Sequence, residues 1–428
     1  MMSRQAGKNE LSAWLEKVLL TLHIASGGTG VKCAPTFRPQ LLTSIERLRK
    51  HLTDAGYGKR IHAVEGFKLG LGKALWTFLS ASPDTNVVGA TASILLEADE
   101  AQDIAPDKFN KDFRPMAATT NATTVLYGTP WSDDTLLQTT IASNLERQRD
   151  DGYRRHFEYD WRAVAAHNPA YARYVEAERQ RLGPTHPLFT TQYELSTIPG
   201  KGRLLSPLQL ANIVGLHQRE HHPIAGLLYV AGLDIAGEDT AELKVRDRDH
   251  NILTVGRVTL PEPHEKHLPP KLDIVALYDW QGTGHDALYA QVSTLLKHHW
   301  RIRHVAVDAT AAGEAAAILL ARTMGASKVT AYRFTQQSKS HLGYALQASA
   351  NTARLKMWAA DGTPEHQEAT RQLRLCRAEY RPNRTVAWQV DPADGHDDYV
   401  VSLALAVQAA STLKQRAARG RIPHRERI

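Results

Sequence analysis

Short apolar runs that end at an acidic residue or a glycine constrain the fold of this chain more than any other feature. Two of them are residues 92–99 (ASILLEAD) and 123–128 (TTVLYG). Such runs are typical of strands buried on both faces of a parallel sheet. Residues 10–24 and 43–52, earlier in the chain, are apolar at helical spacing and read as helices. The alternation predicts an α/β sheet covered on both faces in the first half of the chain.

The second half of the sequence predicts a different sheet. Residues 226–234 read as a strand that runs into a Gly-rich polar turn, and residues 240–280 read as further strands that pair antiparallel. Residues 286–308 follow as a helix and another strand, and residues 397–413 form a last, strongly apolar helix. This order predicts a mixed α+β sheet, separate from the first.

A chain of 428 residues is long enough for two domains. The regular pattern breaks around residues 181–222, which are rich in Pro, Gly and Thr. We therefore expect a first domain over 1–200, a linker over 201–222, a second domain over 223–413 and a basic tail over 414–428.

The charge of the chain favours a polyanionic partner. The formal net charge is +7, and the tail alone holds six Lys or Arg residues and one Glu. Nucleic acid is the first expectation and a membrane surface the second, whereas a solvated tail is the plain alternative. No apolar run approaches the ~18 residues of a membrane span. The two cysteines, Cys33 and Cys376, cannot build a disulfide framework, which fits a reducing cytoplasm.

The beginning of the chain contains part of a phosphate-binding pattern. The P-loop reads G-x-x-x-x-G-K-[ST] between a strand and a helix. Gly7 and Lys8 match its end, but Asn9 replaces the hydroxyl residue and Met2 stands where the first glycine belongs. Taken alone, this match is weak, and a polar start to an amphipathic helix explains it equally well.

A second pattern downstream strengthens the phosphate interpretation. The apolar run at 94–98 is followed by Asp99 and Glu100. This is the Walker B arrangement, in which the first acid binds Mg²⁺ and the next polarises the attacking water. A strand ending in two solvated acids is the structural alternative. The run that ends at Gly128 and Thr129 has the placement of a γ-phosphate sensor or coupling residue.

These segments, in this order, resemble the ATPase half of a large terminase subunit, the motor and nuclease that packages tailed-phage genomes. They are SRQAGKNELSA, VKCAPTFRPQLLTSIERLR, ILLEADEAQDI and TVLYGTPWSDD. The resemblance implies an ATP site in which Lys8 contacts the β- and γ-phosphates and Arg4 lies near them. It also implies that Asp99 binds Mg²⁺, Glu100 is the catalytic carboxylate and Thr129 is the coupling residue.

The chain departs from this family pattern in two ways. Asn9 offers an amide oxygen where a hydroxyl normally meets Mg²⁺. The strand that should precede the loop is absent, so the expected fold is a P-loop (RecA/ASCE-like) α/β domain that is N-terminally incomplete and lacks its first strand. Because a P-loop is a nest of N–H groups fixed between strand and helix, we expect weak or absent ATPase activity.

Acidic residues at the ends of apolar elements mark a second candidate site. Asp234 ends one strand, Asp308 ends another, and Asp397 and Asp398 open the last helix. An acid at a helix start is commonly only a cap. If the strands are neighbours, however, the carboxylates converge, and two charges ~4 Å apart repel by roughly 4 kcal/mol at an effective dielectric near 20. Paired Mg²⁺ or Mn²⁺ ions would offset this repulsion and activate water for phosphodiester cleavage.

The order of these elements resembles an RNase H-like nuclease, and four segments resemble the nuclease domain of a large terminase. They are GLDIAGEDTA, VAVDATAAGE, FTQQSKSHLGYAL and DGHDDYVVSLALA. The resemblance implies an RNase H-like mixed-sheet domain whose two metals are bound by Asp234, Asp308 and one or both of Asp397 and Asp398.

We therefore expect a phage- or prophage-encoded large terminase subunit, acting in the cytoplasm of the bacterial host. It would cut double-stranded concatemeric DNA with Mg²⁺ or Mn²⁺ and couple this to translocation driven by ATP with Mg²⁺. The resemblance implies a small terminase subunit, a portal ring and a ring-shaped homo-oligomer as partners, and no membrane. The alternatives are a helicase-nuclease of recombination or repair, and a degenerate prophage remnant that only binds DNA.

Overall fold

The computed structural model describes residues 1–87, 89–235, 250–310 and 313–413. The chain divides into two compact units, each considered by itself. The first unit contains residues 1–179, 187–200 and 380–384, and the second contains 180–186, 201–379 and the chain from 385 onward. The predicted basic tail at 414–428 lies outside the described residues.

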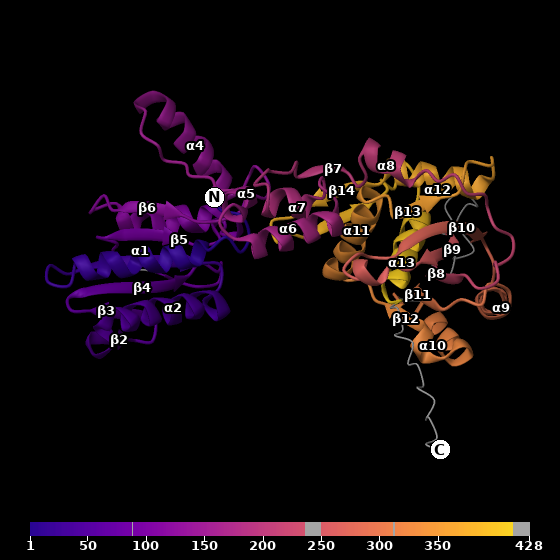
Figure 1. Cartoon of the computed structure of the whole chain (residues 1–428), viewed down its shortest axis with the longest axis horizontal. Helices are drawn as coiled ribbons and strands as arrows, with labels where there is room; N and C mark the ends of the chain where they lie inside the picture. The colour runs from indigo at the N-terminus through magenta and orange to yellow at the C-terminus, as the bar shows by residue number, and fades with distance from the viewer. Residues whose placement is uncertain (88, 236–249, 311–312, 414–428) are drawn as a thin grey trace, which may run out of the picture. The chain divides into compact units, whose positions relative to one another are not determined.

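The first unit is built around a six-stranded sheet in the order β2-β3-β4-β1-β5-β6 (Figure 1). Its strands are β1 (Gly28–Ala34), β2 (Ile61–Val64), β3 (Lys68–Leu71), β4 (Ala74–Ser80), β5 (Leu95–Ala98) and β6 (Thr123–Leu126). Its helices are α1 (Lys8–Leu22), α2 (Leu42–Leu52), α3 (Pro106–Lys108), α4 (Leu136–Asp151), α5 (Trp161–Ala165), α6 (Pro169–Leu182, whose end belongs to the second unit) and α7 (Pro187–Gln192). Strands β4, β1, β5 and β6 are parallel, whereas β2, β3 and β4 pair antiparallel.

Alternate residues of β1 face opposite sides of this sheet, and helices cover both sides. Val31 and Cys33 belong to a core that includes Leu137 of α4. Ala34 belongs to a second core that includes Leu48 of α2. The predicted α/β sheet covered on both faces is therefore confirmed. The antiparallel strands β2 and β3 at one edge were not predicted, because their runs of four residues are too short to give a clear period.

The second unit is built around a sheet in the order β12-β11-β8-β9-β10-β13, with a small sheet β15-β14-β7 (Figure 1). Its strands are β7 (Lys201–Arg203), β8 (Leu228–Asp234), β9 (Asn251–Thr259), β10 (Lys271–Trp280), β11 (His304–Asp308), β12 (Val329–Tyr332), β13 (Leu355–Met357), β14 (Arg377–Tyr380) and β15 (Val386–Gln389). Its helices are α8 (Pro207–Ile213), α9 (His285–Thr294), α10 (Gly313–Met324), α11 (Gln336–Asn351), α12 (Pro364–Leu375) and α13 (Asp398–Ser411).

The directions of these strands match the RNase H-like prediction. Strand β9 is antiparallel to both β8 and β10, whereas β11 is parallel to β8 and to β12. One face of the sheet packs on α9 and α10 through a core that includes Leu233, Leu288 and Ala316. Helix α13 lies on the strands of the same sheet. The mixed sheet separate from the first one is therefore confirmed, whereas the part of it predicted within residues 236–249 lies outside the described residues.

Residues 201–222, predicted as a linker, belong to the second unit. They contain β7, which pairs with β14, and α8, which starts with a capping box at Ser206 and Gln209. Ile213 of α8 is buried. The Pro and Gly residues that suggested a linker instead start and end short elements. No helix within the described ranges is both long and apolar enough to cross a bilayer.

Candidate functional site

Two neighbouring strands of the second unit each end in a buried aspartate. Strands β8 and β11 run parallel, and their last paired residues are Leu233 and Val307. The next residue of each strand is Asp234 and Asp308, so the two carboxylates come from the same row of the sheet. Each aspartate is only 8% exposed. The sheet register therefore brings together two of the residues that the sequence indicated.

Helix α13 brings the remaining acids to the same edge. Gly232 lies two residues before Asp234, and a Cβ there would lie 2.0 Å from the backbone oxygen of Ser402. The Ser402 hydroxyl contacts the backbone oxygens of Gly232 and Ile252, at 2.9 and 3.0 Å. This close approach places the N-terminus of α13, with Asp398, over the end of β8.

The charges of the other three acids act on Asp234. Burial, followed by the charges of Asp398, Asp308 and Asp397, raises the pKa of Asp234 well above its ordinary value. Burial also raises the pKa of Asp308, although a hydrogen bond from Thr310 acts in the opposite direction. Asp398 has a larger effect on Asp234 than Asp397 has. The site therefore disfavours full ionisation unless a cation enters it.

Each of the other three acids already has a polar neighbour. The backbone N–H of Thr310 donates to Asp308 at 2.8 Å, and that of His250 donates to Asp398 at 3.1 Å. The ammonium group of Lys339 lies 3.4 Å from Asp397. These contacts hold the carboxylates at the edge of the sheet and leave further oxygen lone pairs for a ligand.

The donor set fits a hard divalent cation. All four side chains offer carboxylate oxygens, which Mg²⁺ and Mn²⁺ prefer. Within 1–87, 89–235, 250–310 and 313–413, no three His, Cys, Asp or Glu side chains are already gathered as a metal-binding group.

Sequence reasoning missed a second group of residues beside these acids. Nδ1 of His250 lies 2.8 Å from Asp279, whose other oxygen accepts a hydrogen bond from the hydroxyl of Tyr399 at 2.7 Å. The bond with Asp279 raises the pKa of His250. A signal was present, because Asp279 also follows an apolar run at the end of β10.

The predicted phosphate loop lies in the first unit, directly before α1. Gly7 has φ of +87° and precedes the helix, and Gln5 also has a positive φ of +61°. Glycine is favoured in this left-handed conformation because it has no Cβ. The N–H groups of Glu10 and Leu11 bond to the Gly7 oxygen, which starts the helix at Lys8. Before the loop, Met2 forms an isolated parallel bridge with Tyr159.

The structure brings the predicted lysine to the two predicted acids. The ammonium group of Lys8 lies 2.5 Å from Glu100 and 3.8 Å from Asp99. Burial acts against ionisation of Glu100, but Lys8 holds the pKa of Glu100 below its ordinary value. Glu100 has φ of +50°, in the left-handed region that costs free energy for a residue with a side chain.

The other residues predicted to bind nucleotide differ in the contacts that they make. Oδ1 of Asn9 is buried and has no hydrogen-bond partner among the described residues, and such an oxygen fits a cation ligand. The N–H of Thr129, a buried residue, donates to Gln102 at 3.2 Å. Arg4 is tied by its guanidinium group to Gln192 of α7 at 2.6 Å, so it bonds to protein rather than projecting freely.

Arg384 is a further residue of this site that the sequence did not indicate. Its guanidinium group lies 3.1 Å from Asp103 and 3.5 Å from Glu100. Arg384 is 281 positions from Asp103 along the chain, so no local pattern connects them.

Behind α1, a buried cluster ties the lysine helix to the acidic strand. Lys32 donates to Glu16 and to Ser12, each at 2.8 Å, and Ser12 donates to Glu97 at 3.1 Å. Burial and the neighbouring Glu16 raise the pKa of Glu97 well above its ordinary value. The cluster therefore disfavours the ionised form of Glu97.

The fold and geometry together describe a two-unit α/β protein with an acidic, RNase H-like edge in one unit and a phosphate-loop-like site in the other. Comparison of the sequence with protein-family models gave no match, and comparison with curated protein sequences gave none either.

Comparison with solved structures found large terminases. The HK97 bacteriophage large terminase is 14% identical, covering 95% of this chain and 90% of that chain, with a TM-score of 0.37. A large terminase from a thermophilic bacteriophage is 12% identical, covering 94% and 91%, with a TM-score of 0.48, and it has also been solved with ADP. The large terminase nuclease from thermophilic phage G20c with bound magnesium is 18% identical, covering 48% and 96%, with a TM-score of 0.35.

Proposed function

We propose that this protein is a phage or prophage large terminase subunit, a metal-dependent endonuclease for double-stranded DNA joined to an ATP-driven packaging motor. The observation that carries this proposal is that Asp234 and Asp308 are buried at the ends of adjacent parallel strands, where the charges of Asp398 and Asp397 also act on Asp234. Converged buried carboxylates are unfavourable without a cation, and such sites are typical of metal-dependent chemistry.

In the nuclease reaction, the four aspartates would hold two Mg²⁺ or Mn²⁺ ions, which supply an activated water and stabilise the leaving oxygen. Lys339 is partly exposed at the rim of this site, next to Asp397 and over the ring of Trp388. Its position suits a contact with a DNA phosphate. The Thr310 and His250 N–H groups orient two of the carboxylates.

In the ATPase reaction, Lys8 would exchange Glu100 for the β- and γ-phosphates, and Asn9 and Asp99 would face the Mg²⁺ ion. Glu100 would then orient water, and Thr129 would couple the site to the rest of the unit. We propose weak or absent ATP turnover, because Lys8 is already ion-paired and Asn9 replaces the hydroxyl ligand.

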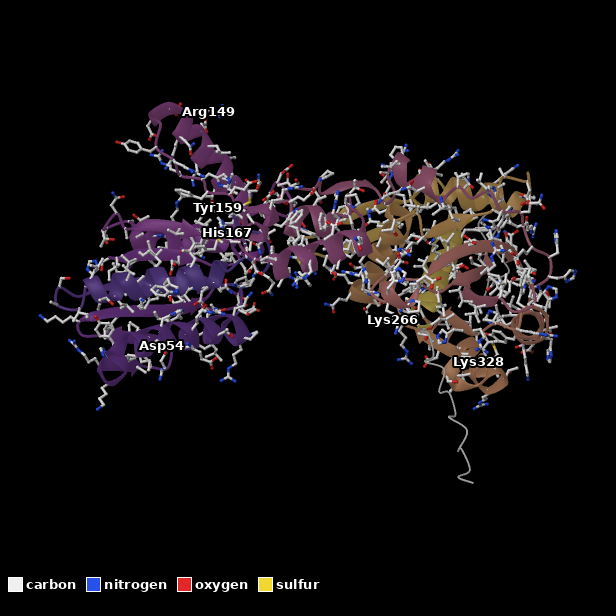
Figure 2. All side chains as sticks on the ribbon, viewed as in Figure 1. Asp54, Arg149, Tyr159, His167, Lys266 and Lys328 are labelled. Carbon is white, nitrogen blue, oxygen red and sulfur yellow. The ribbon has the colours of Figure 1, made fainter. Side chains whose placement is uncertain are left out.

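DNA would be bound mainly through its phosphates, with a strong dependence on salt. Basic side chains such as Arg149, Lys266 and Lys328 extend from the surfaces of the two units (Figure 2). Under this proposal the partners are double-stranded DNA, a small terminase subunit and a portal ring, with the chain acting in a homo-oligomeric ring.

The test is cleavage of supercoiled plasmid by the full chain in Mg²⁺ or Mn²⁺. We expect metal-dependent cutting that Asp308→Asn reduces by at least about 100-fold, a loss of roughly 3 kcal/mol of transition-state stabilisation. Glu314→Gln is the matched control, because this acid pairs with Arg333 on the surface. Folded protein that binds DNA but cuts in neither metal would favour the remnant alternative. ATP-dependent strand unwinding would favour the helicase-nuclease.

A further inference from the structure

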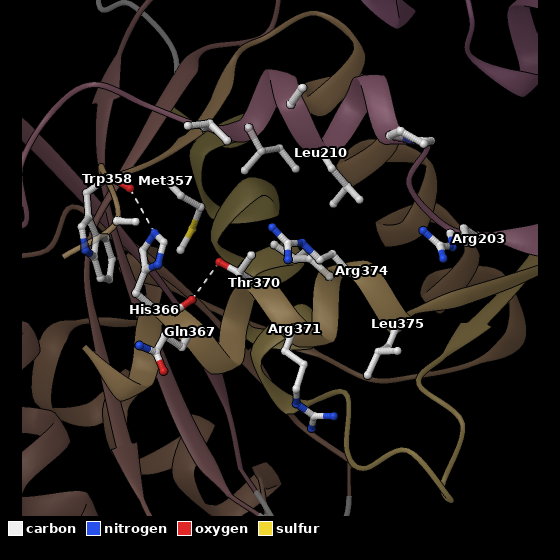
Figure 3. Close-up of a pocket in the computed structure, with 16 residues that line it drawn as sticks. Arg203, Leu210, Met357, Trp358, His366, Gln367, Thr370, Arg371, Arg374 and Leu375 are labelled. Atoms are coloured by element: carbon white, nitrogen blue, oxygen red, sulfur yellow. Dashed lines mark hydrogen bonds between the residues drawn. The ribbon is translucent and has the colours of Figure 1, made fainter. Parts of the chain in front are cut away.

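The second unit contains a pocket that neither candidate site uses. Its volume is about 860 Å³, and residues of β7, α8, β13 and α12 line it (Figure 3). Gln372 of α12 accepts a hydrogen bond from the backbone N–H of Tyr399, at the start of α13. Helix α12 thus contacts α13 through one side and borders this pocket through another.

The pocket is largely apolar, and the chain segment that contains α8 carries further exposed apolar side chains. Leu210 of α8 points toward α12 across the pocket, and Met357 of β13 contributes to its wall (Figure 3). On the same segment as α8, Leu208 is 62% exposed, Val214 63% and Leu216 97%. Grouped exposed apolar residues of this kind mark protein-interaction sites more often than solvent-facing surface.

The charges around the pocket have one sign. Arg203, Arg371 and Arg374 line it, and no aspartate or glutamate is among the described residues that do so. Arg371 is held by Glu368 at 2.7 Å and turns away from the pocket (Figure 3). Within the described part of the chain, Arg203 and Arg374 are exposed and have no ion-pair partner. Arg374 extends toward Leu210, so a positive charge stands beside the apolar lining.

An occupant must therefore offer both apolar side chains and anions. We propose that this pocket docks a short amphipathic acidic segment of a partner protein. Its apolar side chains would enter between α8 and α12, and its carboxylates would pair with Arg203 and Arg374. Duplex DNA fits less well, because its outer surface presents phosphates and would leave the apolar lining without a partner.

The test uses the full chain and a labelled peptide as probe. A helical peptide of about 12 residues, roughly 18 Å long, would carry leucines along one face and glutamates beside them. A second peptide replaces every glutamate with lysine, and a short DNA duplex is the third probe. By fluorescence anisotropy we expect the acidic peptide to bind at least about tenfold more tightly than the lysine peptide.

Two variants locate the binding. Arg203→Glu with Arg374→Glu should weaken binding of the acidic peptide by about tenfold, the upper range for two surface ion pairs. Ala211→Phe, at an exposed position of α8 that lines the pocket, should block binding by filling it. Arg322→Glu is the matched control, because Arg322 is exposed on α10 away from the pocket, and it should leave binding unchanged.

Three outcomes would overturn the proposal. One is no measurable binding of the acidic peptide, and another is equal binding of both peptides. The third is a loss of DNA binding, rather than of peptide binding, in the double arginine variant, which would make this surface a contact for nucleic acid. Plasmid cleavage, measured in parallel, reports separately on the nuclease proposal.

Discussion

A single buried carboxyl group determines much of the behaviour expected of the nuclease site. Asp234 is almost fully buried, and three other acids act on it from β11 and α13. Its raised pKa means that the folded chain holds a proton which the unfolded chain releases near pH 4. In the absence of a cation, ionisation of Asp234 therefore lowers the free energy of unfolding.

Replacing this group should raise stability while removing activity. Asp234→Asn eliminates the buried charge, so we expect a higher melting temperature at neutral pH without metal and loss of metal-dependent plasmid cutting. The unfolded state binds fewer protons between its own pKa, about 3.9, and the raised folded pKa, so the stability of the unmodified chain falls as pH rises through that interval.

Thermal unfolding in chelator, across this pH range, measures the effect. The fall in stability should be smaller in the Asn variant than in the unmodified chain. Identical pH profiles for the two proteins would show that Asp234 is not the group responsible.

The cluster behind α1 should respond unequally to two neutralising changes. Burial and Glu16 raise the pKa of Glu97 and so favour its neutral form, and Glu97→Gln places a neutral group of similar shape there. We therefore expect this change to alter the free energy of unfolding by less than ~1 kcal/mol. Lys32→Met leaves the Glu16 charge buried without a cation and should cost about 3–5 kcal/mol. Urea unfolding measures the free energy of unfolding of both variants. A larger loss of stability for Glu97→Gln than for Lys32→Met would contradict a neutral Glu97.

At the residue level, the sequence predicted the groups whose signal is local. Asp99, Asp234 and Asp308 each follow an apolar run that forms a strand. The place of each acid at the end of a strand could therefore be predicted from its place in the sequence. Arg384 was beyond this method, since its partner Asp103 lies 281 positions away along the chain. The contact of Arg384 depends on packing that no local pattern encodes.

The position of one helix on one strand sets the acidic edge of the second unit. Helix α13 approaches β8 closely at Gly232, and Ser402 fastens it to the backbone of two strands. The sequence predicted this helix and its acids, but not the glycine contact, because strand and helix are far apart along the chain.

A methyl group at that contact should displace the helix. In Gly232→Ala the new Cβ would meet the Ser402 oxygen at 2.0 Å and the Ala406 nitrogen at 2.3 Å. We expect destabilisation of at least about 1–3 kcal/mol and a fall in plasmid cleavage, since Asp397 and Asp398 would move with α13. Gly284→Ala is the control, because nothing lies within 4 Å of that position.

Denaturant unfolding and cleavage would be measured on both glycine variants. If Gly232→Ala unfolds at the same denaturant concentration as the Gly284 control, the proposed tight contact between α13 and β8 is not present.

Across the whole molecule, the chain crosses between the two units more than once. Residues 380–384 belong to the first unit although they connect β14 and β15, and the end of α6 belongs to the second. The sequence suggested a single boundary near residue 200. Composition can indicate a long linker, but it does not reveal short segments that belong to the other unit.

This arrangement predicts unequal behaviour of two fragments. A fragment of residues 1–200 loses the oxygen of Arg381 that accepts from the buried indole of Trp131 at 2.7 Å, and it loses Arg384 beside Asp103. We expect it to be destabilised by about 1–3 kcal/mol relative to the same unit in the full chain. A fragment of residues 201–413 keeps its sheet and core and should fold cooperatively. Equal midpoints for residues 1–200 alone and within the full chain would contradict this.

The pairing of Lys8 with Glu100 has a consequence for timing in the proposed motor. Under the proposed function, one ammonium group would serve two anions in turn, so binding of the phosphate would require release of the Glu100 carboxylate. Without nucleotide, Lys8 would keep the proposed catalytic carboxylate of Glu100 paired and unable to orient water. Each subunit would then become competent for hydrolysis only when it binds its own nucleotide, without a separate inhibitory element.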